Sequence, residues 1–312
     1  MTRILVTGGA GYLGSILVPA LLDRGFAVTV VDNFMYDQDS LAAVCYHQAF
    51  SLVRGDVRSM DAMRPLLKDA DIIIPLAALV GAPLCDRDPL AAMSTNLQAI
   101  ADMLEHLSRD QMVLLPVTNS GYGVGEPGKF CTEETPIRPV SLYGRDKVEV
   151  ERILLERHPS AVSFRLATVF GMSARMRLDL LVNDFTYRAC TDRFIVLFES
   201  HFKRNFIHVR DVARAFLHGI DRFETMKGQV YNVGLSNANL SKLELCQRIQ
   251  QHLPLFVVYE SNIGKDPDKR DYIVSNEKIE RTGYRPQFSL DDGIQELIKG
   301  FAMIRNAKYA NV

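Results

Sequence analysis

The segment "RILVTGGAGYLGS" (residues 3–15) joins a short apolar strand pattern to a glycine-rich turn and the start of a helix. Gly8, Gly11 and Gly14 follow the spacing GxxGxxG. Glycines at these positions allow a tight turn and a close approach of the backbone to a ligand. The helix that follows offers N–H groups and the positive end of its dipole to a pyrophosphate. The segment therefore predicts a dinucleotide-binding β–α unit, with a plain β–α turn as the alternative.

Short apolar runs alternate with amphipathic segments through the first half of the chain. Runs that are apolar at nearly every position are typical of parallel strands buried on both faces. We expect strands at 3–8, 27–32, 50–56, 70–78, 111–118 and 161–171, and helices at 12–24, 59–68, 88–109 and 142–157. This alternation predicts an α/β fold, a Rossmann-type doubly wound parallel sheet with right-handed crossovers.

After about residue 172 the alternation becomes less regular. Helix patterns occur at 178–191, 210–223, 240–252 and 289–305, and strand patterns at 193–197, 229–234 and 255–259. We expect a first domain over 1–171 and a smaller α/β C-terminal lobe over 172–312, with some segments returning to the first domain. A cleft between the two is the default ligand site.

The composition of the 312 residues is that of an ordinary globular protein, with 47% hydrophobic and 23% charged residues. The net charge of −1 argues against nucleic acid or an anionic membrane as a partner. No apolar run approaches the roughly 20 residues that span a bilayer. Five scattered cysteines without a CxxC pair indicate reduced thiols and no zinc site. Because the chain starts with a strand pattern, we expect no signal peptide and a cytoplasmic protein.

Carboxylates follow the second and third expected strands. Asp32 ends the second strand, where it can accept hydrogen bonds from both ribose hydroxyls, and this favours NAD over NADP. Asn33 follows it, and no arginine is placed to receive a 2′-phosphate. Asp56 has two open interpretations. It bonds the adenine amino group, with the backbone N–H of Val57 beside it, or it caps the helix before Met60.

Tyr143 and Lys147 stand four residues apart in "YGRDK". One helical turn places both side chains on the same face. A nearby ammonium lowers the pKa of a tyrosine from its ordinary value of about 10, which prepares the phenol for proton transfer near neutral pH. The spacing also occurs by chance in many helices, so other features of the chain must support the pair.

Matches in order along nearly the whole chain resemble the extended short-chain dehydrogenases/reductases, the sugar-nucleotide epimerase/dehydratase family. They are "TGGAGYLGS" (7–15), Asp32, "GDV" (55–57), "LAALVG" (76–81), Asn96, "TNSGYG" (118–123), "YGRDK" (143–147), "FRLATVFG" (164–171), "RNFIHVRDVARAF" (204–216), "YNVG" (231–234) and "RDYIVSNEKIERTGYRP" (270–286). The resemblance implies an NAD-binding first domain and a C-terminal lobe that binds a nucleoside-diphosphate sugar.

The family resemblance also implies roles for individual residues. Tyr143, Lys147 and Thr118, which stands four before Tyr122, correspond to the catalytic set, with Ser120 as the alternative hydroxyl. The expected cofactor-binding residues are Gly8, Gly11, Tyr12, Leu13, Asp32, Asn33, Asp56, Val57, Leu76, Ala77 and Ala78, together with Tyr143 and Lys147.

For the substrate, Arg204 and Arg270 match arginines that grip a diphosphate, and Asn183 matches an asparagine near the same phosphates. Arg175 and Arg177 are open between substrate contacts and solvated charges at a helix start. The remaining expected substrate-binding residues are Val80, Gly81, Asn119 and Ser120. His208 lies in an apolar strand pattern and is expected to be structural.

Departures from the family pattern narrow the function. Related 4,6-dehydratases carry an acidic pair where this chain has Asn119 and Ser120, which disfavours dehydration. "DIIIPLAALVGAPLC" (71–85) and "RMRLDLLVNDFTYRA" (175–189) resemble a narrower group, the NAD-dependent GDP-heptose dehydrogenases of bacterial surface polysaccharides. That resemblance implies oxidation of GDP-D-glycero-α-D-manno-heptose at C4 for capsule synthesis.

Two other functions stay open beside this one. A nucleotide-sugar 4-epimerase needs the same catalytic residues, and a non-catalytic NAD-binding scaffold does not need them. Family relatives pair through two helices, here 88–109 and 142–157, so we expect a homodimer or homotetramer. The apolar contacts expected on the second helix are Val148, Val150, Ile153 and Leu154.

Overall fold

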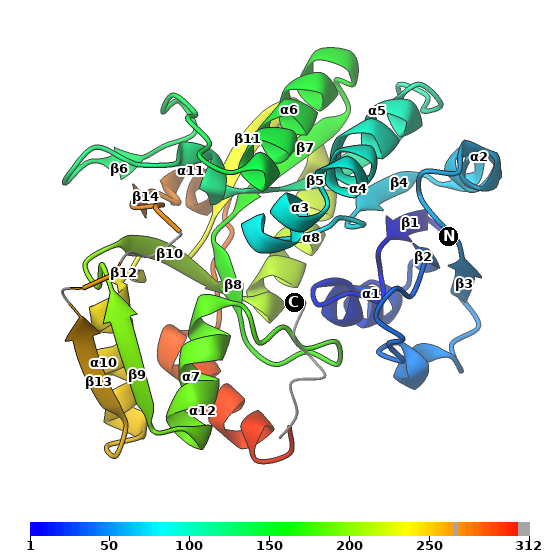
Figure 1. The fold of residues 1–312 in the computed structure, drawn as a ribbon. Coiled ribbons are helices and arrows are strands. Elements are labelled where there is room, and N and C mark those ends of the chain that lie inside the picture. Colours follow the sequence, from blue (N-terminus) through cyan, green and yellow to red (C-terminus); the bar gives the residue numbers. More distant parts are fainter. Residues whose placement is uncertain (262, 265–267, 305–312) are drawn as a thin grey trace.

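A parallel sheet of seven strands forms the centre of the first part of the molecule (Figure 1). The computed structural model describes residues 1–261, 263–264 and 268–304. The strand order is β11-β7-β5-β4-β1-β2-β3. The strands are β1 (Arg3–Thr7), β2 (Ala27–Asp32), β3 (Phe50–Arg54), β4 (Ile72–Pro75), β5 (Met112–Thr118), β7 (Ala161–Leu166) and β11 (Gln229–Val233). The order reverses beside β1, as in the predicted Rossmann-type fold.

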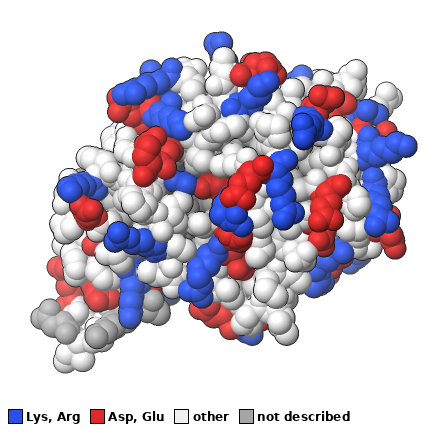
Figure 2. Space-filling model, turned by 90° about the horizontal axis from the view of Figure 1, so that it is seen from above, with Lys and Arg blue, Asp and Glu red and all other residues white. Residues whose placement is uncertain are grey.

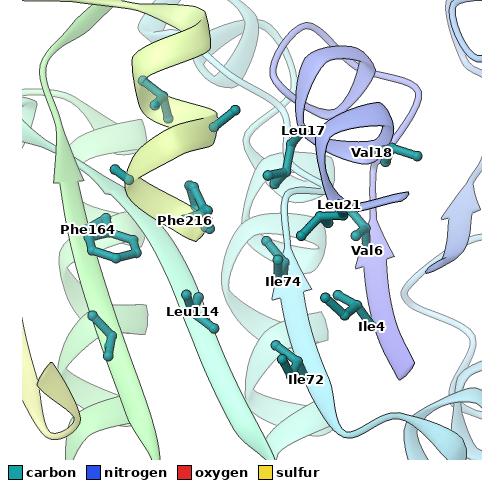
Figure 3. Close-up of a cluster of buried hydrophobic side chains, with 14 of the residues drawn as sticks. Ile4, Val6, Leu17, Val18, Leu21, Ile72, Ile74, Leu114, Phe164 and Phe216 are labelled. Carbon is teal, nitrogen blue, oxygen red and sulfur yellow. The ribbon is translucent and has the colours of Figure 1, made fainter. Parts of the chain in front are cut away.

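Helices cover both faces of this sheet because successive strand side chains point to opposite sides. On one face, Ile4 and Val6 of β1 pack with α1 (Gly14–Asp23) and α8 (Val209–Asp221). Figure 3 shows part of this core, in which side chains of α1 and α8 lie over the strands. The other face is covered by α2 (Met60–Asp69), α5 (Ala99–Leu104) and α6 (Leu142–Arg157).

The expected helix at 88–109 is interrupted and shorter than predicted. The chain forms α4 (Pro89–Met93), a π-helical turn (Ser94–Gln98) and then α5, which ends at Leu104. A π turn inserts one extra residue into the helix and is frequent at functional sites. A further helix, α3 (Ala82–Arg87), forms in a segment for which the sequence predicts none.

The expected strand at 161–171 is two strands in two different sheets. β7 ends at Leu166, and the N–H of Ala167 donates to the carbonyl of Val233 at 2.9 Å. β8 (Thr168–Phe170) then pairs with β10 (Lys203–His208) instead of continuing in the large sheet. β12 (Asn239–Ser241) completes this smaller sheet. A continuous apolar run does not reveal such a change of partner.

The second lobe has a separate apolar core at the end of the sheet away from β3. α7 (Leu181–Thr191), α10 (Lys242–His252) and α12 (Leu290–Phe301) pack around the pair of parallel strands β9 (Phe194–Phe198) and β13 (Val257–Ser261). The short elements are β6 (Phe130–Cys131), β14 (Ile273–Val274), α9 (Phe223–Met226) and α11 (Glu277–Arg281).

Segments from the second half of the chain do return to the large sheet. β11 is its seventh strand, and α8 packs beside α1 on one face. The boundary that we expect after residue 171 remains a prediction. In the part of the chain that the structure describes, no helix is both long enough and apolar enough to cross a membrane.

Candidate active site

A cleft of about 1360 Å³ runs along the carboxyl ends of the parallel strands and reaches the second lobe. Protein pockets for one small ligand usually measure about 300–1,000 Å³, so this cleft has room for two ligands end to end. All the site residues predicted from the sequence line it, except Asn119 and Asn183. Within the described ranges, no group of three or more His, Cys, Asp or Glu side chains is arranged to hold a metal ion.

At one end of the cleft, the turn after β1 approaches the segment after β4 very closely. Gly8 has a φ of +65°, and a Cβ there would lie 2.6 Å from the Cα and the N of Ala77. Only glycine satisfies both constraints. α1 starts just after Tyr12 and Leu13, and N–H groups at a helix start have no partner within the helix. The turn therefore forms a cradle whose shape and polarity suit a phosphate group.

Tyr12 contributes its backbone rather than its phenol to this cradle. Its hydroxyl donates to the carbonyl of Gly171 at 2.6 Å and is buried. Burial raises the pKa of Tyr12 far above its ordinary value. Tyr12 thus ties the first helix to the second lobe.

Asp32 lies at the end of β2 with its carboxylate fixed by the surrounding backbone. One oxygen accepts from the N–H of Ala10 at 3.0 Å, and the other accepts from the N–H of Phe34 at 2.8 Å. Burial raises the pKa of Asp32, and these hydrogen bonds oppose the shift. Gln38, which the sequence did not single out, donates its amide to the same carboxylate at 3.3 Å.

Asp56 does not cap the following helix, so that interpretation is wrong. Ser59 occupies the N-cap position of α2. The carboxylate of Asp56 pairs instead with the guanidinium of Arg58, with the Nη2–Oδ2 distance at 2.6 Å. Hydrogen bonding from Arg58 lowers the pKa of Asp56. The contact of Asp56 with adenine remains a prediction.

Tyr143 and Lys147 lie one turn apart on α6 and both line the cleft. The ammonium of Lys147 is buried and donates to the carbonyl of Pro116 at 3.4 Å. Burial lowers the pKa of Lys147 to about 8. Burial also raises the pKa of Tyr143 to about 12, and the cations that oppose this shift are Arg177 and Arg270. Arg177 and Arg270 belong to the second lobe; the lowering of the Tyr143 pKa by Lys147 and a cationic nicotinamide remains a prediction.

Thr118, at the end of β5, is linked by hydrogen bonds to the second lobe. Its hydroxyl donates to the hydroxyl of Ser120 at 2.9 Å and accepts from the Ser120 N–H at 3.0 Å. The Ser120 hydroxyl in turn accepts from the guanidinium of Arg270. Both candidate hydroxyls thus belong to one chain of hydrogen bonds along the cleft wall.

At the other end of the cleft, a carboxylate bridges the two arginines predicted to hold a diphosphate. Asp268 lies 3.1 Å from Nη2 of Arg204 and accepts from Nε of Arg270 at 2.7 Å and from its Nη2 at 2.5 Å. Burial acts to raise the Asp268 pKa, but hydrogen bonds and charge from Arg270, together with the charge of Arg204, hold it well below its usual range. We did not predict Asp268. No pattern in the sequence marks it, because residues 268–270 lie outside any strand or helix and Arg204 joins the pair only in the folded chain.

Arg175 and Arg177 are not solvated charges at a helix start, because α7 begins only at Leu181 and both side chains are largely buried. Arg177 pairs with Asp179, its Nε lying 3.1 Å from Oδ1. The guanidinium of Arg175 lies over the ring of Tyr36 at 4.3 Å from the centroid, a cation–π geometry. Arg175 therefore lies on the same side of the cleft as the loop after β2.

Two predicted substrate contacts are placed elsewhere. The amide of Asn183 donates to the Tyr12 hydroxyl at 3.2 Å and to the Arg177 carbonyl at 2.9 Å, and its oxygen accepts from the Gly171 N–H at 3.0 Å. Because these partners occupy its side-chain amide, Asn183 links α7 to Tyr12 and Gly171 and does not face a phosphate site in the cleft. Asn119 is buried outside the cleft lining.

Asn96, in the π-helical turn, fixes the segment that leads to Val80 and Gly81. Its side-chain oxygen accepts from the N–H of Leu79 at 2.8 Å, and its amide donates to the Leu79 carbonyl at 2.9 Å. The thiol of Cys85 donates to the same carbonyl at 3.3 Å. These contacts hold one wall of the cleft, and Tyr143 packs against the Leu79–Cys85 cluster.

Comparison with known proteins shows which family the sequence matches. The model of the "NAD dependent epimerase/dehydratase family" matches residues 4–234. The low-salt glycan biosynthesis protein Agl12 of Haloferax volcanii is 30% identical over 95% of this chain and 97% of its own length. UDP-glucuronic acid decarboxylase 1 of Arabidopsis thaliana is 28% identical over 96% of this chain and 69% of its own length.

Solved structures share the fold over nearly the whole chain. The dTDP-glucose 4,6-dehydratase DesIV of Streptomyces venezuelae, solved with NAD bound, has a TM-score of 0.84 and 25% identity over 97% of both chains. The UDP-glucuronic acid 4-epimerase of Bacillus cereus has a TM-score of 0.86 and 22% identity, over 97% of this chain and 99% of its own.

Proposed function

Because the chain belongs to the NAD dependent epimerase/dehydratase family and is an NAD-dependent enzyme, we propose that it oxidises a nucleotide sugar at C4, with GDP-D-glycero-α-D-manno-heptose as the substrate. One observation carries the proposal. Tyr143, Lys147 and Thr118 line the same cleft as Arg204 and Arg270. One elongated ligand in this cleft could therefore contact the proton-transfer residues at its sugar and the two arginines at its diphosphate.

The cradle at the first turn suits NAD. The close approach of Gly8 to Ala77 leaves backbone rather than side chains against a pyrophosphate, and Asp32 presents a fixed carboxylate to a ribose. When bound, NAD supplies the acceptor for the hydride that leaves the sugar carbon. Lys147 is largely buried and lines the cleft beside Tyr143, where it can donate to ribose hydroxyls.

The chain's own residues handle the proton of the sugar hydroxyl. The hydroxyl of Thr118 orients the sugar hydroxyl by hydrogen bonding, and Oη of Tyr143 receives its proton. Burial raises the Tyr143 pKa to about 12, while Arg177 and Arg270 favour the phenolate. Since both arginines belong to the second lobe, the readiness of Tyr143 for proton transfer depends on that lobe.

The two arginines support a diphosphate-linked substrate. Arg204 and Arg270 converge on a single carboxylate, Asp268, and a planar guanidinium pairs equally well with a phosphate. The heptose and the guanine base rest on the resemblance of segments 71–85 and 175–189 to GDP-heptose dehydrogenases. Three of the four relatives named above carry UDP- or dTDP-sugar names, so a comparison of bases is part of the test.

The residues that follow Thr118 do not favour dehydration. Loss of water from the sugar needs an acid and a base beside its fifth and sixth carbons. Asn119 is an amide buried outside the cleft lining, and the Ser120 hydroxyl is bonded to Arg270. These two positions therefore support oxidation without dehydration.

The decisive experiment incubates the purified enzyme with GDP-D-glycero-α-D-manno-heptose in parallel in ordinary and in heavy-oxygen water and follows the product by mass spectrometry. A 4-keto product has lost two hydrogens, so it is about 2 Da lighter than the substrate in ordinary water, whereas in heavy-oxygen water exchange through the hydrate adds about 2 Da back; absorbance of reduced cofactor accompanies the change. The mass of the substrate in both waters, with inverted C4 stereochemistry by NMR, would show a 4-epimerase instead. UDP- and dTDP-sugars in parallel test the base, and Tyr143→Phe is the control for chemistry at this cleft.

A further inference from the structure

The segment 171–177, which follows β8, is hydrogen-bonded to the glycine-rich turn of the cofactor end. The carbonyl of Gly171 accepts from the Tyr12 hydroxyl at 2.6 Å. The hydroxyl of Ser173 donates to the Tyr12 carbonyl at 2.7 Å and lies 2.6 Å from the hydroxyl of Ser15 at the start of α1. This part of the second lobe is therefore tied to the turn that suits a pyrophosphate.

Arg175, two residues further along, reaches the loop that follows β2. Its side chain is only 5% exposed and lines the cleft. The guanidinium carbon lies 4.3 Å from the centroid of the Tyr36 ring, which also lines the cleft. A guanidinium at this distance from an aromatic ring makes a cation–π contact. A cation of the second lobe thus packs on an aromatic residue at the cofactor end.

The loop that carries Tyr36 connects Arg175 to Asp32, the carboxylate expected to bind a ribose. The N–H of Tyr36 donates to the side-chain oxygen of Gln38 at 3.1 Å, and the Gln38 amide donates to Asp32 at 3.3 Å. Burial raises the pKa of Asp32, and the charge of Arg175 is among the influences that oppose this shift. Both contacts and charge therefore place Arg175 in the surroundings of this carboxylate.

The backbone on both sides of Tyr36 has an uncommon conformation. Phe34 has a φ of +54° and Asp37 a φ of +48°. Positive φ is uncommon outside glycine, and such residues persist only where the surrounding structure holds them, often at ligand sites. The hydroxyl of Ser40 donates to the carbonyl of Ala10 at 2.7 Å and fixes the end of this loop to the glycine-rich turn. The loop thus holds the Tyr36 ring in one place.

Exposed charge does not provide a positive surface for a phosphate. Figure 2 shows Lys and Arg interspersed with Asp and Glu over the upper face, and the net charge of the chain is −1. On α6, Val150 and Leu154, which the sequence predicted as contacts with a partner, are buried in the chain's own core. The outer side of α6 carries Arg152, which is paired with two glutamates. A buried cation such as Arg175 is screened less by salt than these exposed charges.

We propose that Arg175 is a cofactor-binding residue that pairs with the pyrophosphate on the adenosine side of NAD, and that Tyr36 positions its guanidinium. Two anionic groups meet at this end, the pyrophosphate and the Asp32 carboxylate, and a cation beside both offsets their repulsion. A guanidinium can stack on a ring and still donate from its edge to phosphate oxygens. The second lobe then helps to retain the cofactor, whichever nucleotide sugar is oxidised.

The test measures release of the cofactor rather than turnover. Enzyme loaded with NADH is mixed with excess NAD in a stopped-flow instrument, and the fluorescence of NADH reports its release. The chain has no tryptophan that would contribute to the signal. Arg175→Met should speed release at least about tenfold, because a charge-assisted hydrogen bond is lost. Arg152→Met, on the outer side of α6, is the control and should keep the wild-type rate.

Variants of Tyr36 test whether its ring positions Arg175. Tyr36→Leu removes the ring and should speed release about three- to tenfold, whereas Tyr36→Phe keeps the ring and should keep the wild-type rate. The double variant of Arg175→Met and Tyr36→Leu should release NADH no faster than Arg175→Met, because the ring acts through the guanidinium. Multiplied effects in the double variant would show that Tyr36 does not act through Arg175.

Wild-type release by Arg175→Met would overturn the proposal. If that variant instead bound GDP or UDP more weakly, Arg175 would belong to the substrate site. If Arg175→Met fails to fold by circular dichroism, the two Tyr36 variants carry the test. Hydrogen exchange of wild-type protein gives a reading without any variant. Added NAD should slow exchange at residues 172–177 as well as at 33–38, and protection of 33–38 alone would contradict a contact from the second lobe.

Discussion

The two ends of the cleft are built in different ways. At the cofactor end, Asp32 accepts from the backbone N–H groups of Ala10 and Phe34, and Gly8 lies against the backbone of Ala77 after β4. At the substrate end, Arg204 and Arg270 are 66 residues apart in the sequence and meet at the Asp268 carboxylate, and the Arg204 guanidinium also donates to the Arg270 carbonyl. The shape of the cofactor end is fixed because it is formed by backbone atoms rather than by side chains. The substrate end depends on ion pairs that a phosphate can replace.

This contrast predicts separate responses to mutation. Damage to the backbone cradle should weaken NAD binding and leave the arginines intact. Changes to the ion pairs should alter the nucleotide-sugar affinity and leave NAD binding intact. Tyr143 lies between the two ends, and its loss should affect the reaction without affecting either binding step.

Tyr143→Phe should give the largest effect. It removes the hydroxyl that receives the sugar proton, so kcat should fall by about 10³-fold, within the usual range for a general acid–base group. NAD and GDP affinities measured by calorimetry should stay near wild type. Tyr36→Phe, a phenol in the same cleft, is the control and should keep its rate. Undiminished turnover by Tyr143→Phe would end the proposed mechanism.

Gly8→Ala should damage the cofactor end alone. Its Cβ would lie 2.6 Å from the backbone of Ala77, at a φ that alanine rarely adopts. Overpacking of this kind costs about 3 kcal/mol, which corresponds to roughly 100-fold weaker NAD binding. Gly25→Ala is the control that separates backbone strain from steric clash. Gly25 also has a positive φ, of +82°, but a Cβ added there would have nothing within 4 Å. NAD binding that survives Gly8→Ala would show that the cradle is more adaptable than its geometry indicates.

Arg204→Met should damage the substrate end alone. Loss of a guanidinium that binds phosphate typically costs about 1.5–3 kcal/mol, so KM for the nucleotide sugar should rise about 10- to 100-fold. NAD affinity should not change. Arg248→Met, which loses an exposed ion pair with Asp291, serves as the control. A weaker affinity for NAD and sugar alike would mean that the two ends are not independent.

The dependence of kcat/KM on pH tests Lys147, which lies beside Tyr143 between the two ends of the cleft. Burial lowers the Lys147 pKa to about 8, so its ammonium is charged below that pH and is lost as the pH rises through it. If the charge is required, kcat/KM should fall about tenfold for each pH unit above about 8. Circular dichroism at each pH checks that the protein stays folded. If kcat/KM stayed constant up to pH 10, catalysis would not require the positive charge of Lys147.

Asp268→Asn should give the smallest effect and in the favourable direction. The carboxylate competes with a phosphate for Arg204 and Arg270, so its neutral isostere should lower KM by about threefold, as expected for a partly exposed ion pair. Asp291→Asn, whose exposed pair with Arg248 is remote from the cleft, is the matched control. An increase in KM would mean that Asp268 orients the arginines rather than competing for them.

Most of the fold was accessible from the sequence because local patterns determine it. Glycine spacing, apolar runs and the position of Asp32 after a strand all act within a few residues. The change of sheet after Leu166 was missed because strand partners are chosen by distant segments, here β10 and β11. The π turn at Ser94–Gln98 was also missed, because periodicity does not resolve a single inserted residue.

The site was predicted in part for the same reason. Residues that act through backbone position, such as Gly8, lie where the pattern places them. The partners of charged side chains were not predictable, since Asp268 and the two arginines converge only in the folded chain. For Asn183 the family pattern predicted a contact with the substrate phosphates. In the structure its side chain is hydrogen-bonded to Tyr12, Gly171 and Arg177 instead.

The return of β11 to the large sheet has a consequence for the order of folding. Residues 229–233 form the outer strand beside β7, so the sheet is incomplete while the ribosome has released only the first half of the chain. Until then β7 presents an unpaired edge, and such edges favour misassembly with other chains. Residues 172–228, which include helix α8 of the large sheet, emerge before that edge is closed. A nascent chain stalled at residue 171 should therefore need a chaperone, whereas one released past residue 233 can complete the sheet by itself.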